Sequence, residues 1–316
     1  MSERALRYGL TVTSDPPQSA DLYLGTVQFA PGGQIEIAYE TSGVSDDPTL
    51  VLISGLGSQL LSWDVDFCRE LAGRGFRVVR FDNRDAGLST HLRQAGIPDL
   101  SPLFRRQPIT EAPYLLADMA HDVADLLDAL DVERAHIVGA SMGGMIAQEV
   151  AAHHPDRTHS LTSIMSTPSP AIGAPTREAA AALFAPPVAT VEEACTSALA
   201  AAEVIGSPGY PLDEARLVAT TSEAFRRAYD PGGVARQLAA IHASGDRTER
   251  LRGIAAPTLV LHGEADPLVQ LPGGQATAAA IPQARLVTFP GMGHDLPRQL
   301  WPRIVDEIAA HAAAAG

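Results

Sequence analysis

The chain has 316 residues, of which 46% are hydrophobic, and a formal net charge of −14. This length suits one large domain or a domain with an insertion, and the acidic balance argues against a nucleic-acid partner, because phosphate binding requires clustered positive charge. All 23 basic residues are arginine, which excludes Schiff-base chemistry on lysine, covalent pyridoxal phosphate and a Walker A lysine.

Residues 1–22 are polar, contain two adjacent prolines, and are predicted to form a loosely packed N-terminal arm. This arm lacks the apolar segment of a secretory signal. No run in the chain approaches the roughly 18 apolar residues of a membrane span. Cys68 and Cys195 lie far apart in sequence, so neither a disulfide framework nor a cysteine metal site is expected. We therefore expect a cytoplasmic protein.

From residue 23 to 167, predicted strands alternate with predicted helices. Runs at 24–29 and 35–41 flank Pro31-Gly32-Gly33 and are predicted to pair as an antiparallel hairpin. Continuous apolar runs follow, which are typical of buried strands in a parallel sheet. Helical spacing of apolar residues marks the segments between them. The strands are expected at 50–54, 76–81, 136–140 and 161–165, and the helices at 63–73 and 114–130.

The strand at 136–140 runs directly into Gly139-Ala140-Ser141-Met142-Gly143 and then a helix. G-x-S-x-G between a strand and a helix is typical of a nucleophile elbow, a tight turn that exposes a serine hydroxyl. The glycines remove side chains that would collide where strand and helix nearly touch. The start of the helix directs free N–H groups and partial positive charge toward the serine. Ser141 is therefore the candidate nucleophile.

The alternation stops between 168 and 247. This segment is rich in alanine and proline and predicts helices near 176–205, 211–228 and 232–243. Strands and helices alternate again after it, with strands at 258–262 and 284–289, a helix at 273–280 and a C-terminal helix from 297. We predict an α/β core made of residues 23–167 and 248–316, into which residues 168–247 are inserted as a helical cap.

Each of the last two predicted strands is followed by a residue that a serine nucleophile needs. Asp266 follows the strand 258–262, and His294 follows the strand 284–289. A serine hydroxyl requires a base within hydrogen-bond reach, held by a third group. We predict His294 as the general base and Asp266 as the acid that orients it. Glu264 is the alternative acid, and Asp295 is expected to be a solvated helix cap.

These motifs resemble those of the α/β-hydrolase family over nearly the whole chain. The segment Gly263–Asp266 is similar to the family's G-x-x-D, Gly291–His294 to its G-x-G-H, and Asp82–Ser89 to its D-x-R-x-x-G-x-S loop. The chain most resembles actinomycete esterases of the aclacinomycin methylesterase type. This resemblance implies a mostly parallel twisted sheet with helices on both faces, an inserted helical cap, no metal and no cofactor.

The resemblance also implies an oxyanion site built from the backbone N–H groups of Leu56 and Met142. The oxyanion loop of the family usually opens with His-Gly, whereas this chain has Ser54-Gly55. Because the donors are backbone groups, their role carries over without the histidine. What supports the loop in place of the histidine stays open.

The predicted substrate pocket comprises side chains that could equally serve as packing. The candidates are Gly55, Trp63, Met165, Phe184, His242 and Met292. His262 is expected to be a satisfied core histidine or a support for the acid loop.

These residues predict a serine hydrolase that cleaves carboxylic esters of an apolar small molecule through an acyl-enzyme. A cofactor-free perhydrolase or haloperoxidase, or a hydrolase of C–C bonds, would use the same triad and stays an alternative. A non-catalytic small-molecule receptor is a more remote one. The oligomeric state is not predicted.

Overall fold

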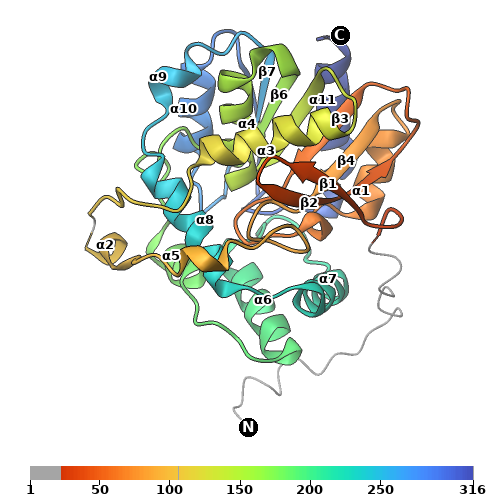
Figure 1. Ribbon diagram of the computed structural model, residues 1–316. Helices are drawn as coiled ribbons and strands as arrows, with labels where there is room; N and C mark the ends of the chain where they lie inside the picture. Colours follow the sequence, from red (N-terminus) through yellow and green to blue (C-terminus); the bar gives the residue numbers. More distant parts are fainter. Residues whose placement is uncertain (1–22, 106, 316) are drawn as a thin grey trace.

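The computed structural model describes residues 23–105 and 107–315, so the predicted N-terminal arm lies outside the described residues. A single eight-stranded sheet crosses the described part of the molecule in the order β1-β2-β4-β3-β5-β6-β7-β8 (Figure 1). The pairs β1–β2 and β2–β4 are antiparallel, and all other neighbouring strands are parallel. The strands are β1 (Gln28–Gly32), β2 (Ile35–Ser42), β3 (Thr49–Ile53), β4 (Arg77–Phe81), β5 (Ala135–Ala140), β6 (Thr158–Ile164), β7 (Thr258–Gly263) and β8 (Arg285–Phe289).

The N-terminal hairpin begins later than predicted. Its first strand is β1, not 24–29, and its turn consists of Gly33 and Gln34. A two-residue hairpin turn requires positive φ, which Gly33 supplies at +58°. Pro31 pairs with Glu36 inside the hairpin. Proline is tolerated at this position because β1 is an edge strand. No further strand lies beyond β1 to need the backbone N–H donor that proline lacks.

Helices cover both faces of the sheet, as predicted (Figure 1). Alternate residues of β3 point to opposite faces: Leu50 and Leu52 belong to one apolar core, and Val51 and Ile53 to the other. The first core contains α1 (Val65–Ala72) and α11 (Trp301–Ala313), and the second contains α3 (Leu116–Ala129) and α4 (Met142–His153). The short helices α2 (Ser101–Phe104) and α9 (Thr248–Leu251) and the helix α10 (Pro272–Ala280) lie outside residues 168–247, the segment predicted to be a cap.

The segment 168–247 between β6 and β7, called the cap segment below, is helical and lies mostly in the lower half of Figure 1. It holds α5 (Arg177–Leu183), α6 (Val191–Ile205), α7 (Glu214–Arg227) and α8 (Pro231–Ala243). The prediction of one helix over 176–205 is wrong, because Pro186 and Pro187 lie between α5 and α6. Proline lacks the backbone N–H and disfavours helical geometry in the residue before it.

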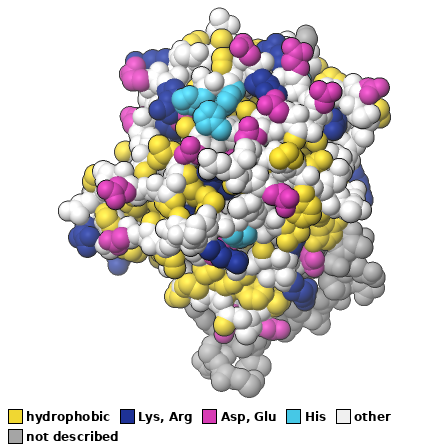
Figure 2. Space-filling model, in the orientation of Figure 1, with side chains coloured by type: hydrophobic (Ala, Val, Ile, Leu, Met, Phe, Trp, Pro, Cys, Tyr) yellow, Lys and Arg dark blue, Asp and Glu magenta, His cyan; other side chains and the backbone are white. Residues whose placement is uncertain are grey.

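The outer surface of this half is more apolar than the rest of the visible face (Figure 2). Ile97 and Phe104, in the segment beside the cap, are 76% and 70% exposed, and Leu212 and Tyr229 of the cap segment are also exposed. No helix within residues 23–105 and 107–315 combines the length and the apolar character needed to cross a membrane.

A buried ion pair ties the antiparallel edge of the sheet to the loop that follows β3. Arg80 on β4 and Glu40 on β2 are fully buried, with Nη2 and Oε2 2.6 Å apart. The same guanidinium donates to the carbonyl oxygen of Trp63 at 2.5 Å. One buried cation therefore neutralises a strand carboxylate and holds the chain just before α1.

Replacement of Arg80 with methionine should leave the Glu40 carboxylate buried without its counter-charge. We expect the Arg80→Met variant to lose about 3–5 kcal/mol of unfolding free energy in urea denaturation. The control is Arg74→Met, which removes an exposed pair with Asp306 and should cost less than about 1 kcal/mol. Equal losses in the two variants would contradict this account of the buried pair.

Candidate active site

Ser141 lies at the turn between β5 and α4 with a backbone conformation that L-residues rarely adopt. Its φ is +58° and its ψ is −121°, as in a nucleophile elbow. The strained residue is held by its own backbone: its N–H donates to the Ile164 carbonyl oxygen at 2.9 Å, and its carbonyl oxygen accepts from the Ser166 hydroxyl at 2.9 Å. Both partners lie at the carboxyl end of the neighbouring strand β6.

The two glycines of the motif allow three backbone segments to meet around Ser141. A Cβ atom on Gly139 would lie 2.0 Å from the Gly143 carbonyl oxygen, and one on Gly143 would lie 2.1 Å from the Ile53 carbonyl oxygen. Both distances are far inside van der Waals contact with rigid backbone. Glycine at these positions therefore lets α4 start directly against the ends of β3 and β5.

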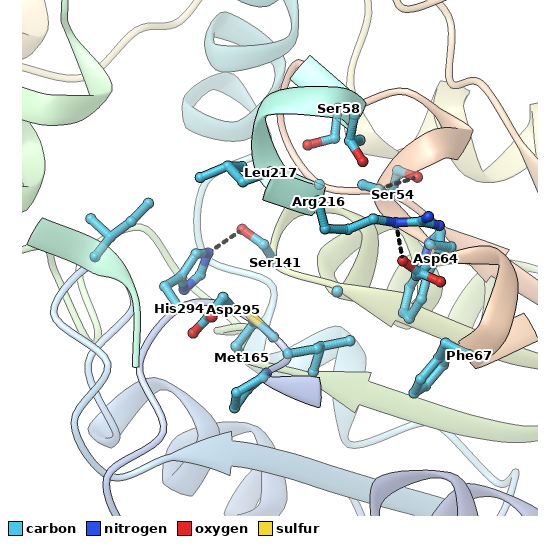
Figure 3. Close-up of a pocket in the computed structure, with 18 of the residues that line it drawn as sticks. Ser54, Ser58, Asp64, Phe67, Ser141, Met165, Arg216, Leu217, His294 and Asp295 are labelled. Carbon is cyan, nitrogen blue, oxygen red and sulfur yellow. Dashed lines mark hydrogen bonds and ion pairs between the residues drawn. The ribbon is translucent and has the colours of Figure 1, made fainter. Parts of the chain in front are cut away.

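The structure brings the three predicted triad side chains together at the carboxyl ends of β5, β7 and β8. Figure 3 shows the Ser141 and His294 side chains facing each other. The His294 Nε2 atom lies 2.9 Å from Ser141 Oγ, and its Nδ1 atom lies 2.7 Å from Asp266 Oδ2. The other Asp266 carboxylate oxygen accepts from the backbone N–H groups of Leu268 and Val269, each at 2.9 Å. The fixed Asp266 carboxylate accepts a hydrogen bond from His294 Nδ1 and so favours the Nδ1–H tautomer. In this tautomer, Nε2 carries no proton and can accept the proton of the Ser141 hydroxyl.

Two other polar groups beside the triad make different contacts. Glu264, the alternative acid, accepts a hydrogen bond from the Thr288 hydroxyl at 2.7 Å on the exposed side of the loop. His262 is fully buried, its Nε2 lies 2.7 Å from the Val269 carbonyl oxygen, and burial lowers its pKa. His262 thus supports the segment that holds Asp266.

The prediction that Asp295 is a solvated helix cap is wrong. Its side chain borders the cavity described below and accepts a hydrogen bond from the Ser207 hydroxyl of the cap segment. That hydroxyl also accepts from the Gly293 backbone N–H at 2.8 Å. Burial raises the pKa of the Asp295 carboxyl. This pair links the histidine loop to the chain that follows α6.

The loop after β3 passes directly beside the serine. A Cβ atom on Gly55 would lie 3.4 Å from Ser141 Cβ and 3.8 Å from Ser141 Oγ. Leu56, the next residue, lines the cavity. Met142 is buried and begins α4, so its N–H is one of the unpaired donors at a helix N-terminus. The two predicted oxyanion donors therefore belong to segments that flank Ser141.

A cavity of about 500 Å³ opens at Ser141 and His294, between the core and the cap. Three of the six predicted pocket residues line it, namely Gly55, Trp63 and Met165, and so does the predicted oxyanion donor Leu56. Phe184, His242 and Met292 are not among the residues that line it. Phe184 packs on Phe104, with ring centroids 5.0 Å apart, and Met292 is fully buried in the core. His242, in the last turn of α8, is half-buried and has a pKa lowered by burial.

The cavity wall includes an ion pair that the sequence analysis missed. Arg216 Nε on α7 lies 2.6 Å from Asp64 Oδ2, which precedes α1 (Figure 3). Both side chains are mostly buried, and they join the cap segment to the core across a mostly apolar surface. Arg216 and Asp64 are too far apart in sequence for a local motif to predict their contact. The apolar lining includes Leu61, Phe67, Leu183, Ile205, Leu212, Leu217, Leu268, Leu296 and Trp301.

Within the described part of the chain, one cluster has its carboxylate and imidazole atoms close enough to hold a metal ion, namely Asp85, His91 and Asp230. Arg236 already pairs with two of these residues, at 2.7 Å from Asp85 and 3.2 Å from Asp230. A buried guanidinium that supplies the counter-charge does not fit a cation site.

Comparisons with known proteins agree with the fold of the described residues. A model of the α/β hydrolase fold matches residues 48–185, and a model of TAP-like proteins matches residues 238–300. The rhodomycin D methylesterase DauP of Streptomyces sp. (strain C5) is 28% identical, covering 89% of this chain and 96% of the relative. A protein of Variovorax paradoxus (strain S110) named "Putative carbamate hydrolase RutD" is 30% identical, covering 81% and 88%.

Solved structures show the same fold. The enol-lactonase of Burkholderia xenovorans LB400 superposes with a TM-score of 0.70 at 25% identity, covering 90% of this chain and 100% of that chain. The esterase RhEst1 of Rhodococcus sp. ECU1013 has a TM-score of 0.71 at 21% identity, covering 92% and 100%. The predicted mostly parallel sheet with helices on both faces is confirmed.

A methyl group at Gly143 should disrupt the elbow. Because its Cβ would meet the Ile53 carbonyl oxygen, we expect Gly143→Ala to lower the melting temperature and to prevent labelling of Ser141 by a fluorophosphonate probe. The matched control is Gly253→Ala, whose nearest neighbour would be the Arg250 carbonyl oxygen at 3.4 Å. Normal labelling and stability in Gly143→Ala would show that the three segments are not tightly packed.

Proposed function

Because the chain belongs to the α/β-hydrolase family, we propose that it is a serine hydrolase that cleaves the carboxylic ester bonds of apolar small molecules. The observation that carries this proposal is the position of the His294 imidazole. It lies within hydrogen-bond distance of Ser141 Oγ on one side and of Asp266 on the other. A serine hydroxyl with a base so placed is equipped for acyl transfer.

In the proposed reaction, Ser141 Oγ attacks the ester carbonyl carbon while His294 Nε2 takes the hydroxyl proton. Asp266 stabilises the imidazolium that forms. The backbone N–H groups of Leu56 and Met142 donate to the oxyanion, each worth about 3–4 kcal/mol in the transition state. The imidazolium then protonates the leaving alcohol, which departs and leaves an acyl-enzyme on Ser141. Water activated by His294 hydrolyses the acyl-enzyme and restores the free serine.

The cavity supports a small, largely apolar substrate. Its volume of about 500 Å³ lies within the range of sites for drug-sized ligands. Two relatives that match about nine-tenths of this chain are named rhodomycin D methylesterases. Rhodomycin D and methyl esters of other apolar small molecules are therefore the first compounds to assay. Peroxide-dependent halide oxidation, or cleavage of a diketone without cleavage of esters, would instead assign the same triad to another reaction.

Removal of the nucleophile should abolish turnover. We expect Ser141→Ala to reduce kcat on p-nitrophenyl esters by about 10⁴-fold or more, since the serine acts in concert with the rest of the triad. The measurement is steady-state hydrolysis, with circular dichroism as the check on folding. A folded Ser141→Ala variant with wild-type turnover would refute the proposed mechanism.

A matched pair of amide substitutions should identify the acid. Asp266→Asn removes the charge that fixes the His294 tautomer, so we expect a fall in kcat of about 10⁴-fold. Glu264→Gln changes a carboxylate two residues away that bonds only to Thr288 among the described contacts, and should retain wild-type kcat. The opposite result would make Glu264 the acid partner of His294.

A further inference from the structure

The loop that follows β3, residues 54–62, carries the proposed oxyanion donor Leu56 and is held by contacts from both the core and the cap segment. We call this segment the oxyanion loop. Its first residue is held from the core, because the Asn83 side chain donates to the Ser54 carbonyl oxygen at 3.0 Å. The Ser54 hydroxyl also bonds to the Ser62 hydroxyl at the far end of the loop, at 3.1 Å. The residues between these ends are held largely from the cap.

Helix α8 supplies the first of these cap contacts. Gln237 is fully buried, and its Oε1 atom accepts from the Gly57 backbone N–H at 2.8 Å. Its Nε2 atom donates to the Arg84 carbonyl oxygen at 2.7 Å. Val234 of the same helix packs so close that a Cβ atom on Gly57 would lie 2.9 Å from its Cγ2 atom. Gln237 thus bridges the oxyanion loop and the loop after β4.

Helix α7 supplies the second set. The Gln59 side chain donates to the carbonyl oxygens of Ala224 and Ala228, at 2.7 and 2.8 Å. Arg227 donates through Nη1 to the Gln59 side chain at 2.9 Å and to Asp82 at 2.6 Å. The same carboxylate accepts from the Leu60 backbone N–H at 2.7 Å. The second half of the loop is therefore fixed between α7 and a buried carboxylate.

The bond from Gln237 acts one peptide away from the proposed donor. Gly57 has a φ of +66°. Because glycine has no Cβ atom, it can adopt many other backbone conformations at little energetic cost. The peptide between Leu56 and Gly57 could rotate easily if its N–H were not bound. Because Gln237 holds this peptide plane, it restricts the backbone of Leu56 and so the direction of the Leu56 N–H.

We propose that Gln237 is a positioning residue for the oxyanion site, through which the cap sets the direction of the Leu56 N–H toward Ser141. The inference rests on the proposed ester hydrolysis. Gln237 is not among the residues that line the cavity, so its effect passes through the loop and not through the substrate.

The test is Gln237→Met, which keeps the shape of the side chain and removes both hydrogen bonds. We expect kcat to fall by about 10- to 100-fold, because a small misplacement of a positioning group costs that much, while KM changes by less than about 3-fold. The fall should be equal for p-nitrophenyl acetate and for p-nitrophenyl esters with larger acyl groups. Gln237→Glu keeps an oxygen that accepts from the Gly57 N–H and should recover most of the loss.

Ser244→Ala is the matched control for stability. Ser244 follows α8 and its hydroxyl accepts from the Leu116 backbone N–H at 3.0 Å, so this variant also loses a bond from the cap segment to a core amide, but far from the oxyanion loop. We expect both variants to lower the melting temperature, and only Gln237→Met to lower kcat. Unchanged kcat in Gln237→Met, or a fall restricted to large esters, would overturn the inference.

Hydrogen exchange gives a readout that does not depend on turnover. In Gln237→Met, amide exchange in residues 54–62 should be faster than in the wild type and in Ser244→Ala. Unaltered exchange there would overturn the inference as well. Wild-type hydrolysis in the same assays separates this outcome from a failure of the proposed function, which would remove activity from every variant alike.

Discussion

The close approach of three backbone segments around Ser141 is the constraint on which the rest of the site depends. The start of α4 lies against the end of β3 because Gly143 has no side chain, and the serine backbone is bonded to the end of β6. A residue in a strained conformation persists only where its surroundings over-determine it. Here the same contacts that hold the strain also bring the loop after β3 to within contact distance of the hydroxyl.

The topology of the sheet places the other members of the site. In a parallel sheet the carboxyl ends of neighbouring strands share one edge, and ligands bind there. The strands β5, β6, β7 and β8 are consecutive neighbours, so the loops that follow them can meet. Asp266 and His294 follow β7 and β8, and each is held by backbone bonds: Asp266 accepts two amides, and the His294 N–H donates to the Ile205 carbonyl oxygen of α6.

Local patterns predicted the features that local physics determines. Apolar runs predicted the buried strands, and glycine spacing around Ser141 predicted the elbow, since both follow from steric and burial rules within a few residues. The break between α5 and α6 and the late start of β1 depend on proline and turn geometry, and the apolar pattern alone misplaced them. Helical periodicity marked Phe184 as apolar but could not specify that its ring packs on Phe104.

Contacts between cap and core left no sequence pattern at all. Gln237 and Gly57 are 180 positions apart, and Arg216 and Asp64 are similarly distant, so only the folded chain shows that they meet. The same holds for Asp295, which lies beside a catalytic candidate in sequence and yet bonds to Ser207 of the cap. Residue propensities and motifs predict the secondary structure of each segment, whereas these contacts depend on how the segments pack in the folded chain.

The pair formed by Arg216 and Asp64 gives the cavity a way to discriminate by net charge. Its two members compensate each other within a mostly apolar wall. An anionic guest would compete with Asp64 for the Arg216 guanidinium, and a cationic guest would compete with Arg216 for the Asp64 carboxylate. Either exchange leaves one buried ion uncompensated, a penalty of several kcal/mol. An uncharged molecule leaves this ion pair intact and incurs no such penalty, so the pair favours uncharged guests at this part of the wall.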